Sequence, residues 1–231
     1  MTSPDYTGIY DPDSDFDSWY TRATGAAIAA RLRPGQCLLE LGCATGLMTV
    51  SFVGAGVEVV GVDRSEAYLA RARSRELAGA TFVQGDVDTY DDGAPFDELT
   101  ATNLIHELPD PHRFLRRCRD RLADGGHLHL SLQNPHSIHR LVALEMGLID
   151  SVHEISARGR EYSTLRLYGG DELAAMGEAA GFTVLEREGV MLKPLPNDRM
   201  AALPDEILEG FVAVSRHFPR HCAMNYLVFQ R

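Results

Sequence analysis

The composition predicts one globular domain and argues against nucleic acid as a partner. The chain has 231 residues, 45% of them hydrophobic and 24% charged, and a formal net charge of −11 at pH 7. Binding phosphates needs concentrated Lys and Arg, and the one dense arginine cluster, at residues 113–121, has the pattern of a solvated helix face. No apolar run approaches the roughly 18 residues of a membrane span. We therefore expect a small-molecule substrate, with no nucleic acid and no membrane as partner.

The amino terminus and the cysteines predict a cytoplasmic protein. Residues 1–5 lack the basic segment followed by an apolar one that marks a secretory signal. No two cysteines form a C-x-x-C pair, so neither a zinc site nor a disulfide framework is indicated. We expect no bound metal, and the sequence leaves the oligomeric state open.

Strands and helices alternate along the chain as far as residue 133. Apolar, β-rich runs predict strands at residues 36–41, 58–62, 80–84, 97–102 and 127–133. Helical patterns lie between them at residues 46–55, 65–77 and 111–122, with Ser65 and Asp110 as expected caps. Alternation of this kind predicts a parallel sheet covered by helices on both faces.

The alternation pauses over residues 134–170, which hold a helix-like stretch around 141–148 and a polar, irregular segment. It resumes with a helix at 171–180, a strand at 183–189, a helix at 204–218 and a last strand at 223–229. We expect a single domain over residues 1–231, with a lid at 1–34 before the first strand and a cap insertion at 134–170.

The first expected strand ends in an acid and a glycine turn, with Glu40 followed by Gly42 and Gly46. Open α/β sheets place their ligands at the carboxyl ends of strands, and glycines let a ligand lie on the amides of the turn. A dinucleotide fingerprint needs G-x-G-x-x-G, whereas this turn reads Gly42-x-Ala44-x-x-Leu47. An acid just before the first glycine suits a ligand with an ammonium group, and S-adenosylmethionine is such a ligand.

The second expected strand also ends in an acid. Asp63 follows Gly42 by 21 residues (63 − 42). An acid at about 20 residues from such a turn typically accepts hydrogen bonds from the two hydroxyls of a ribose. The two strand ends together predict a nucleoside site.

With these motifs, the chain resembles the class I S-adenosylmethionine-dependent methyltransferases of the small-molecule type. The matching segments are residues 39–46, 59–63, 82–86, 96–108 and 122–133. The resemblance implies a Rossmann-like sheet of seven mostly parallel strands, whose last strand runs antiparallel beside the fifth. It also implies S-adenosyl-L-methionine as the cofactor and a substrate that lies under the insertion between strands five and six.

The resemblance further implies the cofactor contacts. Asp86 would accept a hydrogen bond from the adenine amine, and the backbone of Val87 would meet the ring. Asn103 would lie near the methionine part, and His106 would face either the thioether side or the adenine edge. Arg22 is the candidate for the cofactor carboxylate, because a guanidinium pairs with a carboxylate through two parallel hydrogen bonds. The expected cofactor set is Arg22, Glu40, Gly42, Cys43, Ala44, Gly46, Asp63, Arg64, Asp86, Val87, Asn103, Leu104 and His106.

The expected catalytic residues lie after the fifth strand. Methyl transfer to a hydroxyl needs a proton acceptor, and His136 and His139 titrate near neutral pH and share one face if a helix begins there. Asn134 and Tyr168 are further candidates, because a tyrosine ring that faces a sulfonium stabilises it. Each histidine could instead cap or pack against this helix. Lys193 is expected to be a surface or turn residue.

Three functions stay open on the sequence alone. The first is a methyltransferase that acts on a small biosynthetic metabolite and leaves S-adenosyl-L-homocysteine. The second is a lyase of the same fold that cyclises S-adenosylmethionine to a small-ring amino acid and releases methylthioadenosine, with Asn134 and Tyr168 beside the sulfonium. The third is a module that binds S-adenosylmethionine without turnover.

Overall fold

A computed structural model describes residues 9–231, and the amino-terminal residues in which no leader was predicted lie outside this range. The strands are β1 Cys37–Leu41, β2 Glu58–Asp63, β3 Ala80–Gln84, β4 Phe96–Thr102, β5 Leu122–Gln133, β6 Thr183–Leu192 and β7 Cys222–Gln230. The α-helices are α1 Ser18–Ala29, α2 Thr49–Gly54, α3 Glu66–Ser74, α4 Pro111–Arg121, α5 Ile138–Glu145, α6 Ala157–Glu161, α7 Gly170–Ala179, α8 Asn197–Met200 and α9 Asp205–Ala213. Two 3-10 helices are η1 Ile105–Glu107 and η2 Val214–His217.

All seven strands form one sheet in the order β3-β2-β1-β4-β5-β7-β6. β1 pairs in parallel with β2 and β4, β2 with β3, and β4 with β5. β7 lies between β5 and β6 and runs antiparallel to both. The structure therefore confirms the predicted sheet, including the antiparallel last strand beside the fifth.

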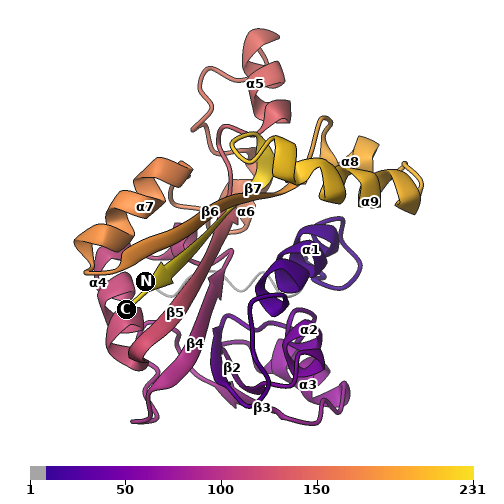
Figure 1. Ribbon diagram of the computed structural model, residues 1–231. Helices are drawn as coiled ribbons and strands as arrows, with labels where there is room; N and C mark the ends of the chain where they lie inside the picture. Colours follow the sequence, from indigo (N-terminus) through magenta and orange to yellow (C-terminus); the bar gives the residue numbers. More distant parts are fainter. Residues whose placement is uncertain (1–8) are drawn as a thin grey trace.

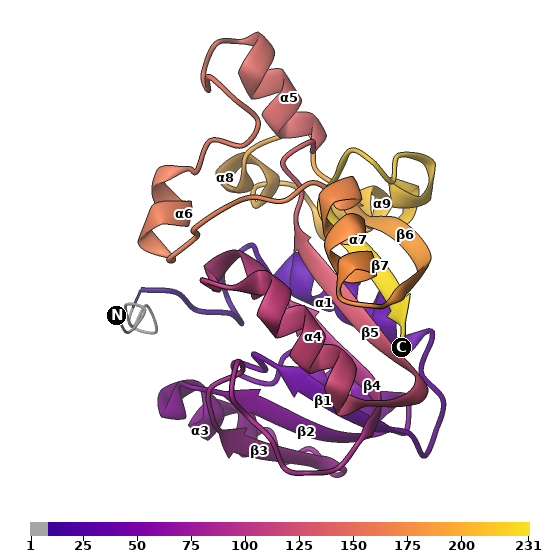
Figure 2. The same ribbon diagram turned by 90° about the vertical axis from the view of Figure 1, so that its left-hand side faces the viewer.

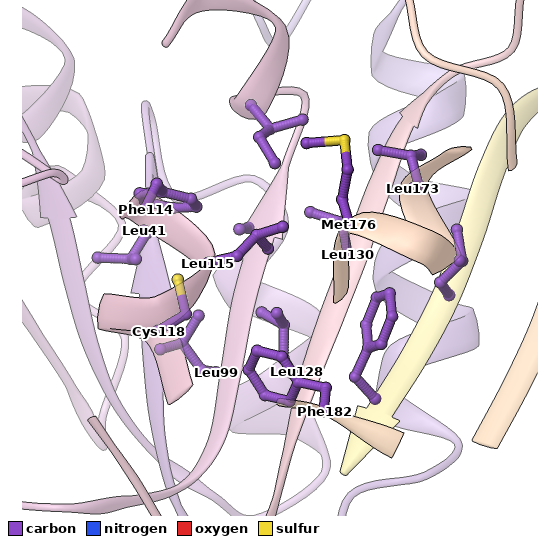
Figure 3. Close-up of a cluster of buried hydrophobic side chains, with 14 of the residues drawn as sticks. Leu41, Leu99, Phe114, Leu115, Cys118, Leu128, Leu130, Leu173, Met176 and Phe182 are labelled. Carbon is purple, nitrogen blue, oxygen red and sulfur yellow. The ribbon is translucent and has the colours of Figure 1, made fainter. Parts of the chain in front are cut away.

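Helices cover both faces of the sheet (Figure 1), with α1, α2 and α3 on one side and α4 and α7 on the other. Figure 3 shows the apolar core between the sheet and α4 and α7. Its buried members include Leu41, Leu99, Phe114, Leu115, Cys118, Leu128, Leu130, Leu173, Met176 and Phe182. In α7, a Cβ on Gly177 would lie 2.1 Å from Cε1 of Phe229, so only glycine lets the helix approach β7 this closely.

Element boundaries differ from the prediction where turns and pairing decide them. α2 begins at Thr49 rather than at residue 46, because Gly46 adopts a φ of +73° in the turn before it. β5 begins at Leu122 rather than at residue 127, because Leu122 pairs with Phe96 across a register shift. The expected caps are confirmed, since the side chains of Ser65 and Asp110 accept backbone hydrogen bonds at the starts of α3 and α4.

Of the α4 arginines, Arg113 and Arg116 are exposed, whereas the side chain of Arg121 is only 11% exposed. Arg113 pairs with Asp88, and Arg121 pairs with Asp91 and Asp92. The insertion at residues 134–170 carries α5 and α6, which lie beyond the carboxyl end of β5 (Figure 2). Over residues 9–231, no helix combines the length and the apolar character that crossing a bilayer requires.

Candidate functional site

A cavity of about 400 Å³ lies at the carboxyl ends of β1, β2 and β4, and we call it the strand-end cavity. Parallel strands bring their carboxyl ends to one edge of the sheet, so residues far apart in the chain meet there. The expected cofactor residues that line it are Glu40, Gly42, Cys43, Ala44, Asp63, Arg64, Asp86, Val87, Asn103 and Leu104.

Glu40 is a buried acid that lines this cavity from the carboxyl end of β1. Its Oε2 accepts a hydrogen bond of 2.5 Å from the hydroxyl of Thr49. Burial, only partly offset by that hydrogen bond, raises the pKa of Glu40 to about 8, and nearby Asp63 adds to the rise. A neutral acid at pH 7 would ionise when a cation binds beside it.

Asp63 holds the turn after β1 against the end of β2. Its Oδ2 accepts from the backbone N–H of Ala44 at 2.9 Å, and its Oδ1 accepts from that of Ser65 at 2.8 Å. Burial raises the pKa of Asp63, although these two hydrogen bonds favour the ionised form. Each carboxylate oxygen keeps further acceptor capacity toward the cavity.

The turn after β4 adds a polar group that residues 9–231 leave unsatisfied. Asn103 adopts a φ of +49°, and its backbone N–H donates to the carbonyl of Ser131 at 2.9 Å. Its side-chain Oδ1 is buried without a hydrogen-bond partner among residues 9–231. Such an atom favours a ligand donor, because an unsatisfied buried acceptor is costly. Asp86, across the cavity, accepts from the backbone N–H of Asp88 at 2.8 Å, so it also shapes its own turn.

Three expected cofactor residues lie elsewhere. Arg22 is exposed and lies outside the cavity, since the side of α1 that faces it carries Thr21. Gly46 packs against the sheet, because a Cβ there would lie 3.1 Å from the ring of Phe82. His106 lies in a second cavity, described next.

This second cavity, also of about 400 Å³, lies under the insertion, and we call it the cap cavity. Tyr10, Asn103 and Glu107 line both cavities, so the two adjoin. The cap cavity is lined from α1, η1, β5, α5, α6, β7 and the segment after β6. Burial lowers the pKa of His106 to about 4, and its Nδ1 is buried without a partner among the described residues.

Lys193 and His139 meet in the cap cavity. The Nζ of Lys193 lies 3.5 Å from the Nε2 of His139 and 5.9 Å from the ring centre of Tyr20. Burial, together with Lys193 and Arg140, lowers the pKa of His139 to about 3. Burial also lowers the pKa of Lys193, to about 8. His139 is therefore neutral at pH 7 and a poor general base, contrary to the near-neutral titration expected for it.

The other expected catalytic residues do not join this pair as donors or acceptors. His136 is exposed and packs edge-on against His153, because α5 begins only at Ile138 and the two histidines do not share a helix face. Asn134 lines the cap cavity, but its amide donates to the carbonyls of Arg220 and Cys222, and its Oδ1 accepts from the N–H of His136.

Tyr168 lies away from both cavities. Its ring belongs to the core beside α4 and α7, and Cζ of Arg166 lies 5.0 Å from its centre. The structure therefore does not bring Tyr168 to the cavities where its contact with a sulfonium was predicted, because its side chain lies among residues of α4 and α7 instead.

Lys193 was expected on the surface and is 9% exposed. Lys193 follows β6, and the antiparallel pairing of β6 with β7 brings it under the cap insertion. No local sequence pattern predicts a contact between Lys193 and the insertion. The sequence did carry one signal, since Lys193 is the only lysine in the chain. Among residues 9–231, no three His, Cys, Asp or Glu side chains are grouped so that they could hold a metal ion.

Comparison with known proteins agrees with this geometry. A family model described as a methyltransferase domain matches residues 18–187. Ubiquinone biosynthesis O-methyltransferase of Aeromonas salmonicida (strain A449) is 26% identical over 186 residues, which cover 78% of this chain and 74% of that protein.

Two solved structures share the fold. The S-adenosylmethionine-dependent methyltransferase from Mesorhizobium loti superposes with a TM-score of 0.63 at 19% identity, over 96% of this chain and 100% of that one. Magnesium protoporphyrin IX methyltransferase from Synechocystis PCC 6803, with bound S-adenosylhomocysteine, gives 0.63 at 15% identity, over 96% and 88%.

The seven-stranded sheet with its antiparallel last strand defines the class I S-adenosylmethionine-dependent methyltransferase fold. The chain belongs to the methyltransferase domain family, whose model covers most of its length, and it is an enzyme that uses S-adenosylmethionine.

Proposed function

We propose that this methyltransferase acts on a small-molecule acceptor that binds in the cap cavity beside the cofactor in the strand-end cavity. The strongest support is that two cavities of about 400 Å³ each lie side by side. Tyr10, Asn103 and Glu107 line both of them. A compartment of this size holds a metabolite-sized ligand and leaves no room for a folded partner.

The residues of the strand-end cavity fit the cofactor. Asp63 would accept from the ribose hydroxyls, Asp86 and the backbone of Val87 would meet the adenine, and Glu40 would face the ammonium group. The unsatisfied Oδ1 of Asn103 would accept from the methionine part. When bound, the cofactor supplies a methyl group activated by its positively charged sulfur.

The protein's contribution to transfer is then positioning and exclusion of water. Tyr10 and Tyr20 bring aromatic rings to the cap cavity, and burial raises the pKa of both, so both stay neutral. The hydroxyl of Tyr20 donates to Oδ1 of Asn197 at 3.0 Å. Asn134 supports the loop after β5 through its hydrogen bonds, and we assign it a positioning role rather than a chemical one.

The cap cavity also bears on the lyase alternative. A lyase that cyclises the cofactor needs no second compartment, and Tyr168, the residue expected beside its sulfonium, lines neither cavity and packs in the core beside α4 and α7. We therefore favour transfer to an acceptor over cyclisation. We also propose a cytoplasmic location, because all four cysteines are free.

The test begins with S-adenosylmethionine and the purified protein alone. We expect binding without product, and a methylated compound plus S-adenosylhomocysteine only after small metabolites are added. Release of methylthioadenosine from the cofactor alone would instead establish cyclisation. Tight binding with no product from any metabolite fraction would establish the non-catalytic module.

A further inference from the structure

The cap cavity contains a buried cation that lacks an anion. Lys193 is 9% exposed, and its nearest polar contact is the neutral imidazole of His139 at 3.5 Å. It forms no ion pair with a carboxylate of residues 9–231. A buried ammonium without a counter-ion is costly, and a ligand that brings a negative charge removes that cost.

The groups around Lys193 leave this part of the cavity positive. Arg158 and Arg140 lie near it and oppose its charge, while Asp17 and Asp198 favour it. Asp17 is already paired with Arg158 at 3.3 Å. Asp198 is a largely exposed side chain, so solvent screens it.

Arg140 adds a second positive charge that no carboxylate of the described residues neutralises at close range. Its Nε donates to the carbonyl of Val152 at 2.9 Å, and its Nη2 donates to that of Glu154 at 2.5 Å. Carbonyls satisfy the N–H donors and leave the guanidinium charge in place. Glu107, the other acid of the cavity, lies 3.7 Å from His106 and 3.9 Å from Arg64.

His139 does not neutralise the Lys193 ammonium. The neutral Nε2 of His139 can accept at most one of the three N–H groups of the ammonium. Nδ1 of the same ring is fully buried, so it is not the atom that a ligand in the cavity would reach. The group that the cap cavity offers to a carboxylate is therefore the ammonium of Lys193.

We propose that the acceptor is a small organic anion whose carboxylate binds to Lys193 in the cap cavity, with His139 as the positioning residue that orients the ammonium. This deepens the proposed function and rests on it. The charge at this site is positive, although the net charge of the whole chain is −11. The site therefore selects anions at short range rather than by long-range attraction. A phosphate dianion binds best to the paired N–H groups of a guanidinium. Arg140 and Arg158 already bind other groups of the chain, which favours a monoanion as the ligand.

The single lysine makes the test direct. Selective ¹³C-lysine labelling of the full chain gives one ε-carbon signal, and its pH titration reports Lys193 alone. When benzoate is added with S-adenosylhomocysteine, we expect this signal to shift until binding is saturated. We also expect the pKa of Lys193, read as the midpoint of the pH titration, to rise from about 8. The neutral isostere benzamide should leave the midpoint unchanged.

Variants give a second readout by calorimetry. Lys193→Met should weaken benzoate binding by about tenfold or more while S-adenosylhomocysteine binds as before. The matched control Arg199→Met removes an exposed charge on α8 and should stay within twofold. If Lys193→Met does not fold, the wild-type titration decides by itself.

Several results would overturn the proposal. One is that benzoate and benzamide have the same effect on the titration midpoint of Lys193. Another is that inorganic phosphate alone moves this midpoint. S-adenosylhomocysteine alone could move it, in which case Lys193 holds the cofactor carboxylate. Each of these leaves the methyltransferase proposal standing, whereas failure of S-adenosylhomocysteine to bind at all would remove the proposed function itself.

Discussion

The buried acid Glu40 predicts that cofactor affinity depends on pH in a particular way. Its pKa of about 8 means that the free protein carries a neutral side chain at pH 7. A ligand ammonium prefers the carboxylate, so binding releases a proton and affinity rises as the pH approaches 8. Above that pH, the ligand's own α-amino group, with an ordinary pKa of about 8, loses its charge and affinity falls.

Glu40→Gln isolates this effect, because the amide copies the shape of the neutral acid and its carbonyl still accepts from Thr49. The substitution loses a charge-assisted hydrogen bond of about 1.5–3 kcal/mol. At pH 7 the wild type spends on the order of 1 kcal/mol on ionising Glu40, so the net loss is at most about 2 kcal/mol, or roughly 30-fold. At pH 8 ionisation costs less than about 1 kcal/mol, and the loss grows to about 1–3 kcal/mol, or roughly 5- to 150-fold.

The assay is calorimetry with S-adenosylhomocysteine from pH 6 to 9, in buffers of different ionisation enthalpy that count the released proton. The wild type should show the ascending limb below pH 8 and the variant should lack it. Stability supplies the folding control. The pKa of Glu40 is raised above its ordinary 4.5, so the contribution of Glu40 to stability falls as the pH rises from 4.5 to 8, and the variant should melt higher than the wild type at pH 7. Identical pH profiles for the two proteins would refute the reasoning.

Three further substitutions test other parts of the molecule. Asp63→Ala removes the acceptor for two backbone N–H groups and for the ribose, so cofactor affinity should fall by about a hundredfold or more in calorimetry; a change under threefold would contradict the site. His106 is buried neutral with a pKa of about 4, so its contribution to the unfolding free energy should decline as the pH falls from 6.5 toward 4, by up to about 1.4 kcal/mol per pH unit. In urea titrations, the difference in unfolding free energy between the wild type and His106→Gln should change with pH by this amount, and a difference that does not depend on pH would exclude this histidine as the source. Gly177→Ala forces a Cβ against Phe229 and should cost about 1–3 kcal/mol, whereas Gly210→Ala meets open space and serves as its control; equal melting temperatures would show that α7 can shift.

The strand-end cavity could be predicted because its residues are set by local patterns. Glu40 and Asp63 end β-rich runs, and parallel strands bring their carboxyl ends to the same edge whatever the rest of the chain does. The sheet of seven mostly parallel strands and the antiparallel β7 beside β5 followed from the resemblance that these motifs carry. The sequence by itself thus determined the fold and most of the residues that line the strand-end cavity.

Only the tertiary structure decided which side chains outside the strand ends reach the two cavities. Arg22 and Thr21 are neighbours in α1, and the packing of that helix turns Thr21 toward the strand-end cavity and Arg22 toward solvent. Lys193 and His139 are 54 residues apart and meet through the pairing of β6 with β7. The direction of a side chain in an irregular segment depends on contacts with distant parts of the chain, and no periodicity in the sequence records those contacts.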